Sequence, residues 1–122
     1  MNKYLVLIYG DEQVWDAASD EWGAENERRH GEFAAEAGDA LLGGFELQRT
    51  SAALSIRVGD AGAPQVTDGP FLESKEVVGG YYLVQAPNIE EAARLASLIP
   101  EASAAVGGVE IRPVLMSEGS AS

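Results

Sequence analysis

A ten-residue segment, TDGPFLESKE at residues 67–76, gathers ionisable side chains around a Gly-Pro step. An aspartate ahead of this step can accept hydrogen bonds from backbone N–H groups two residues on, and Pro70 fixes its own φ angle. The proline also restricts Gly69 to extended geometry. A carboxylate held in this way has the preorganisation that a catalytic or ligand-orienting acid needs. Asp68 is therefore a candidate general acid or base, although initiating a turn is the commoner role of aspartate in such a tripeptide.

The residues after the Gly-Pro step extend this candidate site. We expect Phe71 to fill a place in the core and pin the loop. Lys75 could bind an anionic group of a ligand or lower the pKa of a nearby carboxylate. Glu73 could take part in the same site. The alternative for both charged residues is a solvated loop tip, where ion pairs contribute little stability.

Two tyrosines and an arginine add further candidates. Gly79 and Gly80 interrupt a strongly apolar strand, which is typical of a bulge or of a close approach to the backbone. Tyr81 and Tyr82 follow on opposite faces, so one belongs to the core and the other could present its hydroxyl to a cleft. Arg112 could bind a ligand carboxylate or form a salt bridge with Glu110 on the same face. Tyr9, at the end of the first strand, is a further candidate for ligand binding.

His30 is the one histidine in the chain, and histidine exchanges protons near neutral pH. It lies in a predicted helix between Arg29 and Gly31, and no recognisable motif surrounds it. We therefore predict a position on the surface rather than in a site.

The composition excludes several functions. The chain has no cysteine and one histidine, so we expect no metal site, and no cofactor-binding motif is present. With 20 acidic against 8 basic residues the formal net charge is -12, which argues against direct contact with nucleic acid or anionic membranes. The short apolar run at the N-terminus lacks the features of a membrane span or signal peptide. We expect a cytoplasmic, acidic protein.

Hydrophobic periodicity predicts one α+β domain over residues 1–116 and a disordered polar tail over residues 117–122. We expect helices from Asp20, as the cap, to about Ala37 and from Asn88 to Pro100, and a loop over Asp11–Asp20. The predicted strands are Tyr4–Tyr9, Ala40–Leu47, Ala53–Val58, Val77–Ala86 and Val109–Val114, with extended chain over Pro64–Thr67. This order is that of a ferredoxin-like βαββαβ fold, with both helices on one face of an antiparallel sheet.

The first predicted strand carries apolar side chains on both of its faces. Antiparallel sheets with helices on one side normally have a polar outer face. An apolar outer face marks an interface, and a second copy of the chain is the simplest cover. The alternative is that the tail and the long loops cover it. We predict a homodimer in which two sheets meet, with Asp68 facing a sheltered cavity.

Several motifs together resemble a known family. The segment DGPFLESKE at residues 68–76 and the GGYY of residues 79–82 are similar to the DGPF branch of the YCII-related proteins. The opening YLVLIYG and the closing VEIRP, at residues 4–10 and 109–113, are similar to the start and the end of that family's members. The likeness spans residues 3–114, nearly the whole chain.

The resemblance implies a ferredoxin-like unit that forms a dimeric α+β barrel, with a cleft near the DGPF aspartate, here Asp68. A His–Asp pair is proposed as catalytic in the wider family, and His30 lies outside any matched motif. Genes of this branch often accompany sigma factors of the extracytoplasmic-function class, which implies regulation and a sigma-factor partner. We therefore expect a small-ligand-binding or regulatory module. The alternative is a cofactor-free enzyme that uses Asp68 on a small hydroxylated or aromatic substrate, with Lys75 or Arg112 holding a negative charge.

Overall fold

The structure, a computed structural model, describes residues 1–71 and 74–115. A four-stranded antiparallel sheet has the order β2-β5-β1-β6, and β3 and β4 form a separate hairpin. The strands are β1 (Asn2–Gly10), β2 (Leu41–Glu46), β3 (Leu54–Val58), β4 (Pro64–Asp68), β5 (Val77–Ala86) and β6 (Gly108–Pro113). The helices are α1 (Glu12–Ala17), α2 (Asp20–Ala37) and α3 (Ile89–Ala96), with 3-10 turns η1 (Gly38–Ala40), η2 (Thr50–Ala52) and η3 (Pro100–Ser103). The predicted α+β class is confirmed, and the strand order is compatible with a ferredoxin-like fold.

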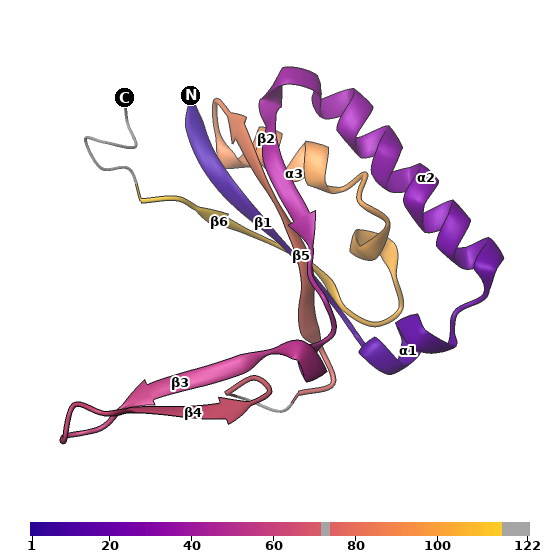
Figure 1. Cartoon of the computed structure of the whole chain (residues 1–122). Coiled ribbons are helices and arrows are strands. Elements are labelled where there is room, and N and C mark those ends of the chain that lie inside the picture. The colour runs from indigo at the N-terminus through magenta and orange to yellow at the C-terminus, as the bar shows by residue number, and fades with distance from the viewer. Residues whose placement is uncertain (72–73, 116–122) are drawn as a thin grey trace.

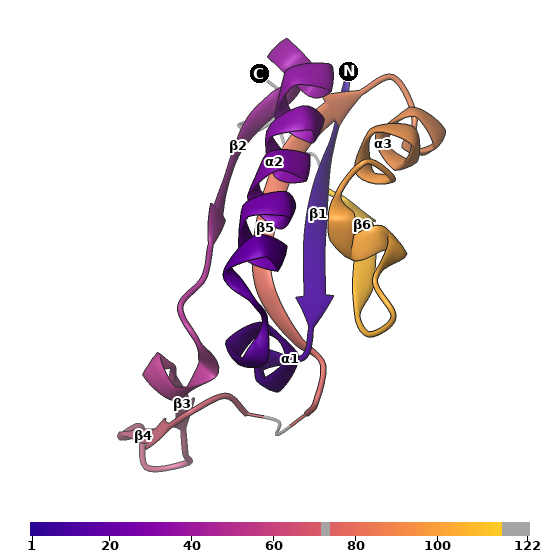
Figure 2. The ribbon, with the colours of Figure 1, turned by 90° about the vertical axis from the view of Figure 1, so that its right-hand side faces the viewer.

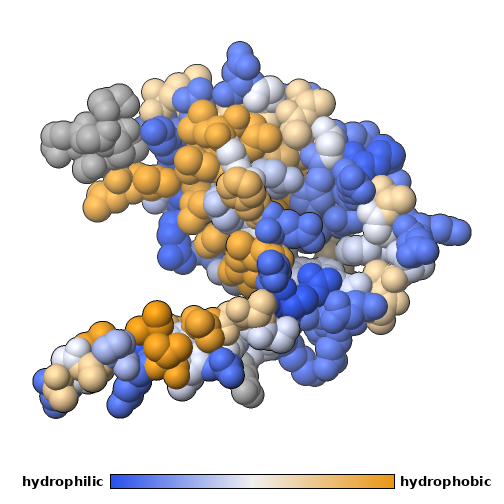
Figure 3. Space-filling view, viewed as in Figure 1, coloured by the Kyte–Doolittle hydropathy of each residue, from blue (hydrophilic) through white to orange (hydrophobic). Residues whose placement is uncertain are grey.

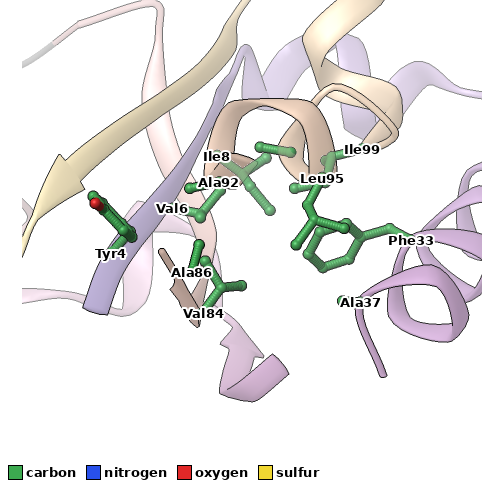
Figure 4. Close-up of a cluster of buried hydrophobic side chains, with 11 residues drawn as sticks. Tyr4, Val6, Ile8, Phe33, Ala37, Val84, Ala86, Ala92, Leu95 and Ile99 are labelled. Atoms are coloured by element: carbon green, nitrogen blue, oxygen red, sulfur yellow. The ribbon is translucent and has the colours of Figure 1, made fainter. Parts of the chain in front are cut away.

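Both long helices, α2 and α3, cover the same face of the sheet (Figures 1 and 2). Alternate residues of β1 and β5 point toward them, and Phe33 of α2 meets the α3 side of the core (Figure 4). The buried apolar residues are Tyr4, Val6, Ile8, Phe33, Ala37, Val84, Ala86, Ala92, Leu95, Ala96 and Ile99. Both buried residues of α2, Phe33 and Ala37, lie in its C-terminal half.

Local hydrogen bonds explain where the helices begin. The Asn88 side chain accepts from the backbone N–H of Glu91 at 2.9 Å, as the capping pattern predicts. Ser19, and not Asp20 as predicted, caps α2 by accepting from Trp22 N–H at 3.0 Å. The loop predicted over residues 11–20 was partly wrong, because Asp11 caps the short helix α1 through Gln13 N–H at 2.8 Å.

The Asp-Gly-Pro step closes the β3–β4 hairpin. Gly69 donates its N–H to the Ala53 carbonyl at 2.7 Å, and its own carbonyl accepts from the buried Ser55 hydroxyl at 2.6 Å. Gly69 has a φ of 88°, a conformation that favours glycine, so the extended geometry expected from Pro70 is not adopted. The motif thus fixes where the hairpin ends and where the chain turns back toward β5.

An apolar surface remains open on the side opposite the helices. The hairpin projects away from the sheet on this side (Figure 1), and Figure 3 shows apolar side chains on both walls of the notch between them. Exposed residues on the hairpin and on or after β2 are Leu42, Phe45, Leu47, Leu54, Ile56, Val58 and Val66. Neither face of the sheet is therefore polar throughout, as the sequence indicated for β1.

In the described part of the chain, no helix is long and apolar enough to cross a membrane.

Candidate functional site

A pocket of about 570 Å³ lies between the N-terminal half of α2 and the helix-covered face of the sheet. Its α2 wall is a stripe of residues at helical spacing, namely Trp22, Gly23, Asn26, Glu27 and His30. Apart from Trp22, small and polar side chains occupy these positions, so the helix leaves space here, whereas Phe33 fills it one turn further on. Small-molecule sites typically have volumes of about 300–1,000 Å³, so the pocket is of suitable size.

Three side chains from three elements form a continuous hydrogen-bonded chain at the pocket wall. His30 Nδ1 lies 2.8 Å from the Tyr82 hydroxyl, and His30 Nε2 lies 2.8 Å from Glu101 Oε1. Glu101 Oε2 accepts from Asn26 Nδ2 at 2.9 Å. The His30 and Glu101 side chains are 22% and 10% exposed, so this Tyr82–His30–Glu101 chain is largely shielded from water.

The burial of Glu101 determines which nitrogen of His30 carries the proton. Glu101 Oε1 is buried and lies 2.8 Å from His30 Nε2, and no other donor in the described part of the chain forms a hydrogen bond with this oxygen. A buried carboxylate oxygen without a donor is costly, so Nε2 must carry a hydrogen. In the neutral ring, Nδ1 then accepts from the Tyr82 hydroxyl. The arrangement makes Nδ1 the basic atom of the site.

Electrostatics keep Glu101 ionised and Tyr82 protonated. Burial raises the pKa of Glu101, but hydrogen bonds from His30 and Asn26 outweigh it, so this pKa lies below its ordinary value. Burial raises the pKa of the Tyr82 phenol, and the charges of Glu101 and Glu46 raise it further. At neutral pH the site therefore holds a carboxylate at Glu101 and a neutral phenol at Tyr82.

Trp15 of α1 closes one end of the pocket. Its indole lies against Gly10 and Gly79, where a Cβ atom on either glycine would overlap the ring. Gly79 is located where the β1–β5 register shifts, next to Ile8 and Tyr9. The bulge or close approach predicted for the paired glycines is therefore confirmed, and the approaching group is the Trp15 ring. The Arg49 guanidinium carbon lies over the same ring, 5.2 Å from its centroid.

Replacing Gly79 with alanine is expected to displace Trp15 and lower the free energy of unfolding by about 1–3 kcal/mol, as overpacking does. Urea unfolding measures the stability, and a red shift of tryptophan emission in a Trp22→Phe background reports release of the ring. Gly31→Ala is the matched control, because an added Cβ there meets nothing within 4 Å. Unchanged stability and emission in Gly79→Ala would contradict this position of Trp15.

The structure does not bring the predicted DGPF residues to this pocket. Asp68 is exposed at the end of β4 and does not line it. Phe71 was predicted to fill the core, which was wrong: it is 57% exposed and lies beneath the Arg57 guanidinium, 4.5 Å away. Lys75 is exposed beside the start of α1, in a shallow depression with Asp11. Glu73 lies outside the described residues, as does the predicted tail over 117–122.

The remaining candidates divide between the two faces of the sheet. On the outer face, Glu110 accepts from Tyr9 Oη at 2.9 Å and from Arg112 at 2.7 Å, so the salt-bridge alternative for Arg112 is the one adopted. The hydrogen bonds from Arg112 and Tyr9 lower the pKa of Glu110. The hydrogen bond to Glu110 raises the pKa of the Tyr9 phenol. Tyr82 points to the helices, and Tyr81 packs against the ring of Phe45 at 6.3 Å.

Sequence reasoning missed the residue at the centre of the site. His30 was predicted on the surface, and this was wrong because Tyr82 and Glu101 hold it in a largely buried position. A signal was present: residues 22, 26 and 30 share one helical stripe with the buried Phe33 and Ala37 positions. Nothing in the sequence showed that Glu101, 71 positions later, would meet this stripe.

Comparison with known proteins gives the family. The family model described as the YCII-related domain matches residues 2–117. The chain belongs to the YCII-related family. This YCII-related protein is also 38% identical over 120 residues to the uncharacterized protein R00369 of Rhizobium meliloti (strain 1021), covering 93% of this chain and 92% of the relative. The resemblance inferred from the sequence is thus confirmed. The family and this relative carry no assigned activity.

The pocket can perform two kinds of chemistry with the residues it has. It can bind a small molecule between aromatic walls, or it can accept a proton through the Tyr82 hydroxyl into His30 Nδ1. Within residues 1–71 and 74–115, no three histidine or acidic side chains are grouped closely enough to hold a metal ion.

Proposed function

We propose that this YCII-related protein is a small-ligand-binding module and that its site is the pocket beneath α2. The observation that carries the proposal is the Tyr82–His30–Glu101 chain, which presents a polar, preorganised wall to a 570 Å³ space. The cleft near Asp68 that the family resemblance implied is a weaker site, because Asp68 is exposed in the single chain. In the regulatory form of this proposal, ligand binding controls contact with an extracytoplasmic-function sigma factor.

The proposal includes a homodimer formed through the outer face of the sheet. Leu5, Leu7 and Leu83 are half-buried there although no helix covers them. An isolated two-stranded hairpin is only marginally stable in water, yet β3–β4 exposes four large aliphatic side chains beside this face. A second copy would remove both surfaces from water. Asp68 would then lie at the edge of the interface instead of in bulk solvent.

A second function, acid–base catalysis, is favoured by the same hydrogen-bonded chain. A substrate hydroxyl bonded to Tyr82 would give its proton to the phenol oxygen as that phenol passes its own proton to His30 Nδ1. The ionised Glu101 stabilises the imidazolium that results. The Tyr82 phenol stays neutral throughout, in agreement with its raised pKa. In this form His30 replaces Asp68 as the acid–base group.

A pair of glycine substitutions on α2 tests where the ligand binds. Thermal-shift screening against small aromatic and hydroxylated compounds supplies a hit. Gly23→Leu places a side chain in the pocket, and we expect it to weaken binding of that hit at least ten-fold. Gly31→Leu is the matched control, because both glycines lie on the same helix with open space around their Cβ positions and only Gly23 lines the pocket.

The Asp68→Asn variant separates this site from the DGPF loop. We expect Asp68→Asn to bind the hit as wild type does. A hit lost in Asp68→Asn but retained in Gly23→Leu would refute the pocket beneath α2 and restore the loop as the site.

A further inference from the structure

The pocket contains more negative than positive charge. Three carboxylates line it, those of Glu27, Glu46 and Glu101. The guanidinium that also lines it, Arg49, donates through Nε to Asp16 Oδ1 at 2.9 Å, so a carboxylate outside the pocket already balances its charge. In a chain with a formal net charge of -12, this local excess is not offset by the surroundings.

The excess negative charge acts inside the pocket. The Tyr82 phenol lies on the pocket wall, and the carboxylates of Glu101 and Glu46 both raise its pKa in addition to the effect of burial. The same potential that disfavours a phenolate at this position disfavours any ligand anion and favours a cation. The anion-binding groups anticipated from the sequence, Lys75 and Arg112, lie elsewhere.

The aromatic walls favour the same sign of charge. Trp15, Trp22 and Tyr82 line the pocket, and the face of an aromatic ring attracts cations. Trp15 already shows this preference, because the Arg49 guanidinium carbon lies 5.2 Å from its ring centroid. An organic cation with an aromatic body would find both ring faces and carboxylates within one space.

We propose that the pocket takes an aromatic amine-bearing ligand, an arylalkylammonium cation. The aromatic body stacks among Trp15, Trp22 and Tyr82, and the ammonium group is held by the carboxylates of Glu27 and Glu46. A hydroxyl on the ligand ring, where present, faces the Tyr82 hydroxyl. This assignment rests on the proposed function, since it names the chemical class of ligand for that same pocket.

Three matched probes test the charge of the ligand: tyramine, 4-ethylphenol and 3-(4-hydroxyphenyl)propionate. They share a phenol ring and a two-carbon arm, and at neutral pH they are cationic, neutral and anionic. Both tryptophans of the chain line the pocket, so quenching of intrinsic fluorescence reports binding directly. We expect tyramine to bind at least ten-fold more tightly than either of the other probes.

Two substitutions localise the effect. The double variant Glu27→Gln and Glu46→Gln is expected to weaken tyramine binding at least ten-fold and to leave 4-ethylphenol unchanged. Glu90→Gln with Glu32→Gln removes the same net charge from exposed positions outside the pocket, and we expect it to bind tyramine as wild type does.

Each contrary outcome has one meaning. Equal or tighter binding of the neutral or anionic probe overturns the cation assignment and leaves the pocket as a ligand site. Failure of all three probes also overturns it, while a hit of other chemistry that Gly23→Leu abolishes still supports the proposed function. An equal loss of tyramine binding in the two double variants would show that the net charge of the whole protein attracts tyramine. That outcome would refute a cation site at Glu27 and Glu46.

Discussion

Replacing His30 with leucine is expected to lower the free energy of unfolding by about 3 kcal/mol at neutral pH. The substitution removes the hydrogen bond to Glu101 Oε1, whose side chain is 10% exposed and has no alternative donor for this atom among the described residues. The charge then remains buried with Asn26 as its remaining side-chain donor among the described residues. Urea unfolding monitored by circular dichroism measures the loss.

A double variant shows whether the loss arises from the pair. His30→Leu with Glu101→Leu removes the stranded charge, so we expect it to be more stable than His30→Leu alone. Arg28→Leu serves as the control on the same helix. Arg28 pairs with Glu25 and Glu32 at the surface, so its removal should cost less than about 1 kcal/mol. A single His30→Leu variant as stable as the Arg28→Leu control would contradict the buried pair.

The same pair predicts a pH dependence with a definite sign. In the wild type, folding lowers the pKa of Glu101. The contribution of this carboxylate to stability is therefore present at pH values above its unfolded-state pKa, and it is lost as the pH falls through its folded-state pKa. In His30→Leu the carboxylate is buried without its main partner, so folding raises the pKa of Glu101 instead. Protonation of Glu101 then removes the unfavourable buried charge from the variant. We expect the difference in unfolding free energy between wild type and His30→Leu to narrow as the pH falls from 7 to about 4. A deficit that stays constant over this range would exclude an ionised Glu101.

If the proposed homodimer forms through the outer face, replacing Leu83 with glutamate is expected to convert it into a monomer of 12.9 kDa. Leu83 lies on β5 in the middle of the outer face, opposite Leu5 of β1. A carboxylate at this position would lie in the interface without a partner charge, and desolvation of an unpaired charge costs several kcal/mol. In the single chain the same position is only half-buried, so the protomer can still fold.

Sedimentation velocity at micromolar concentration measures this change. Ala24→Glu is the control, because Ala24 is exposed on α2 and the substitution adds the same charge on the helix side. We expect wild type and Ala24→Glu to sediment as dimers and Leu83→Glu as a monomer. A wild-type protein that sediments as a monomer would refute the homodimer and leave the hairpin and sheet face without a cover.

The DGPF motif shows how a specific sequence pattern can be correctly recognised while its functional role stays a prediction. Its residues identified the family, and the structure gives them a structural role in the described chain. Gly69 and Ser55 lock the base of the hairpin through two short hydrogen bonds. The rigidity that the sequence indicated for this turn is present, but it holds the hairpin and does not aim Asp68 into the pocket of its own chain.

The sequence by itself determined the elements and the family. The apolar runs of β1 and β5, the Asn88 cap and the paired glycines are local features, and local features are encoded over a few neighbouring residues. They sufficed for the α+β class, the order of the strands along the chain and the expectation of a bulge or close approach at Gly79.

Only the tertiary structure decided the site. His30, Tyr82 and Glu101 come from α2, β5 and η3, and their hydrogen bonds depend on how two helical segments pack on one sheet face. Contacts between residues so far apart in the sequence leave no local sequence pattern. They depend on how the helices pack on the sheet and not on residue spacing along the chain. The same packing buried Phe33 and Ala37 in the C-terminal half of α2, and the preceding stripe from Trp22 to His30 became the wall of a pocket.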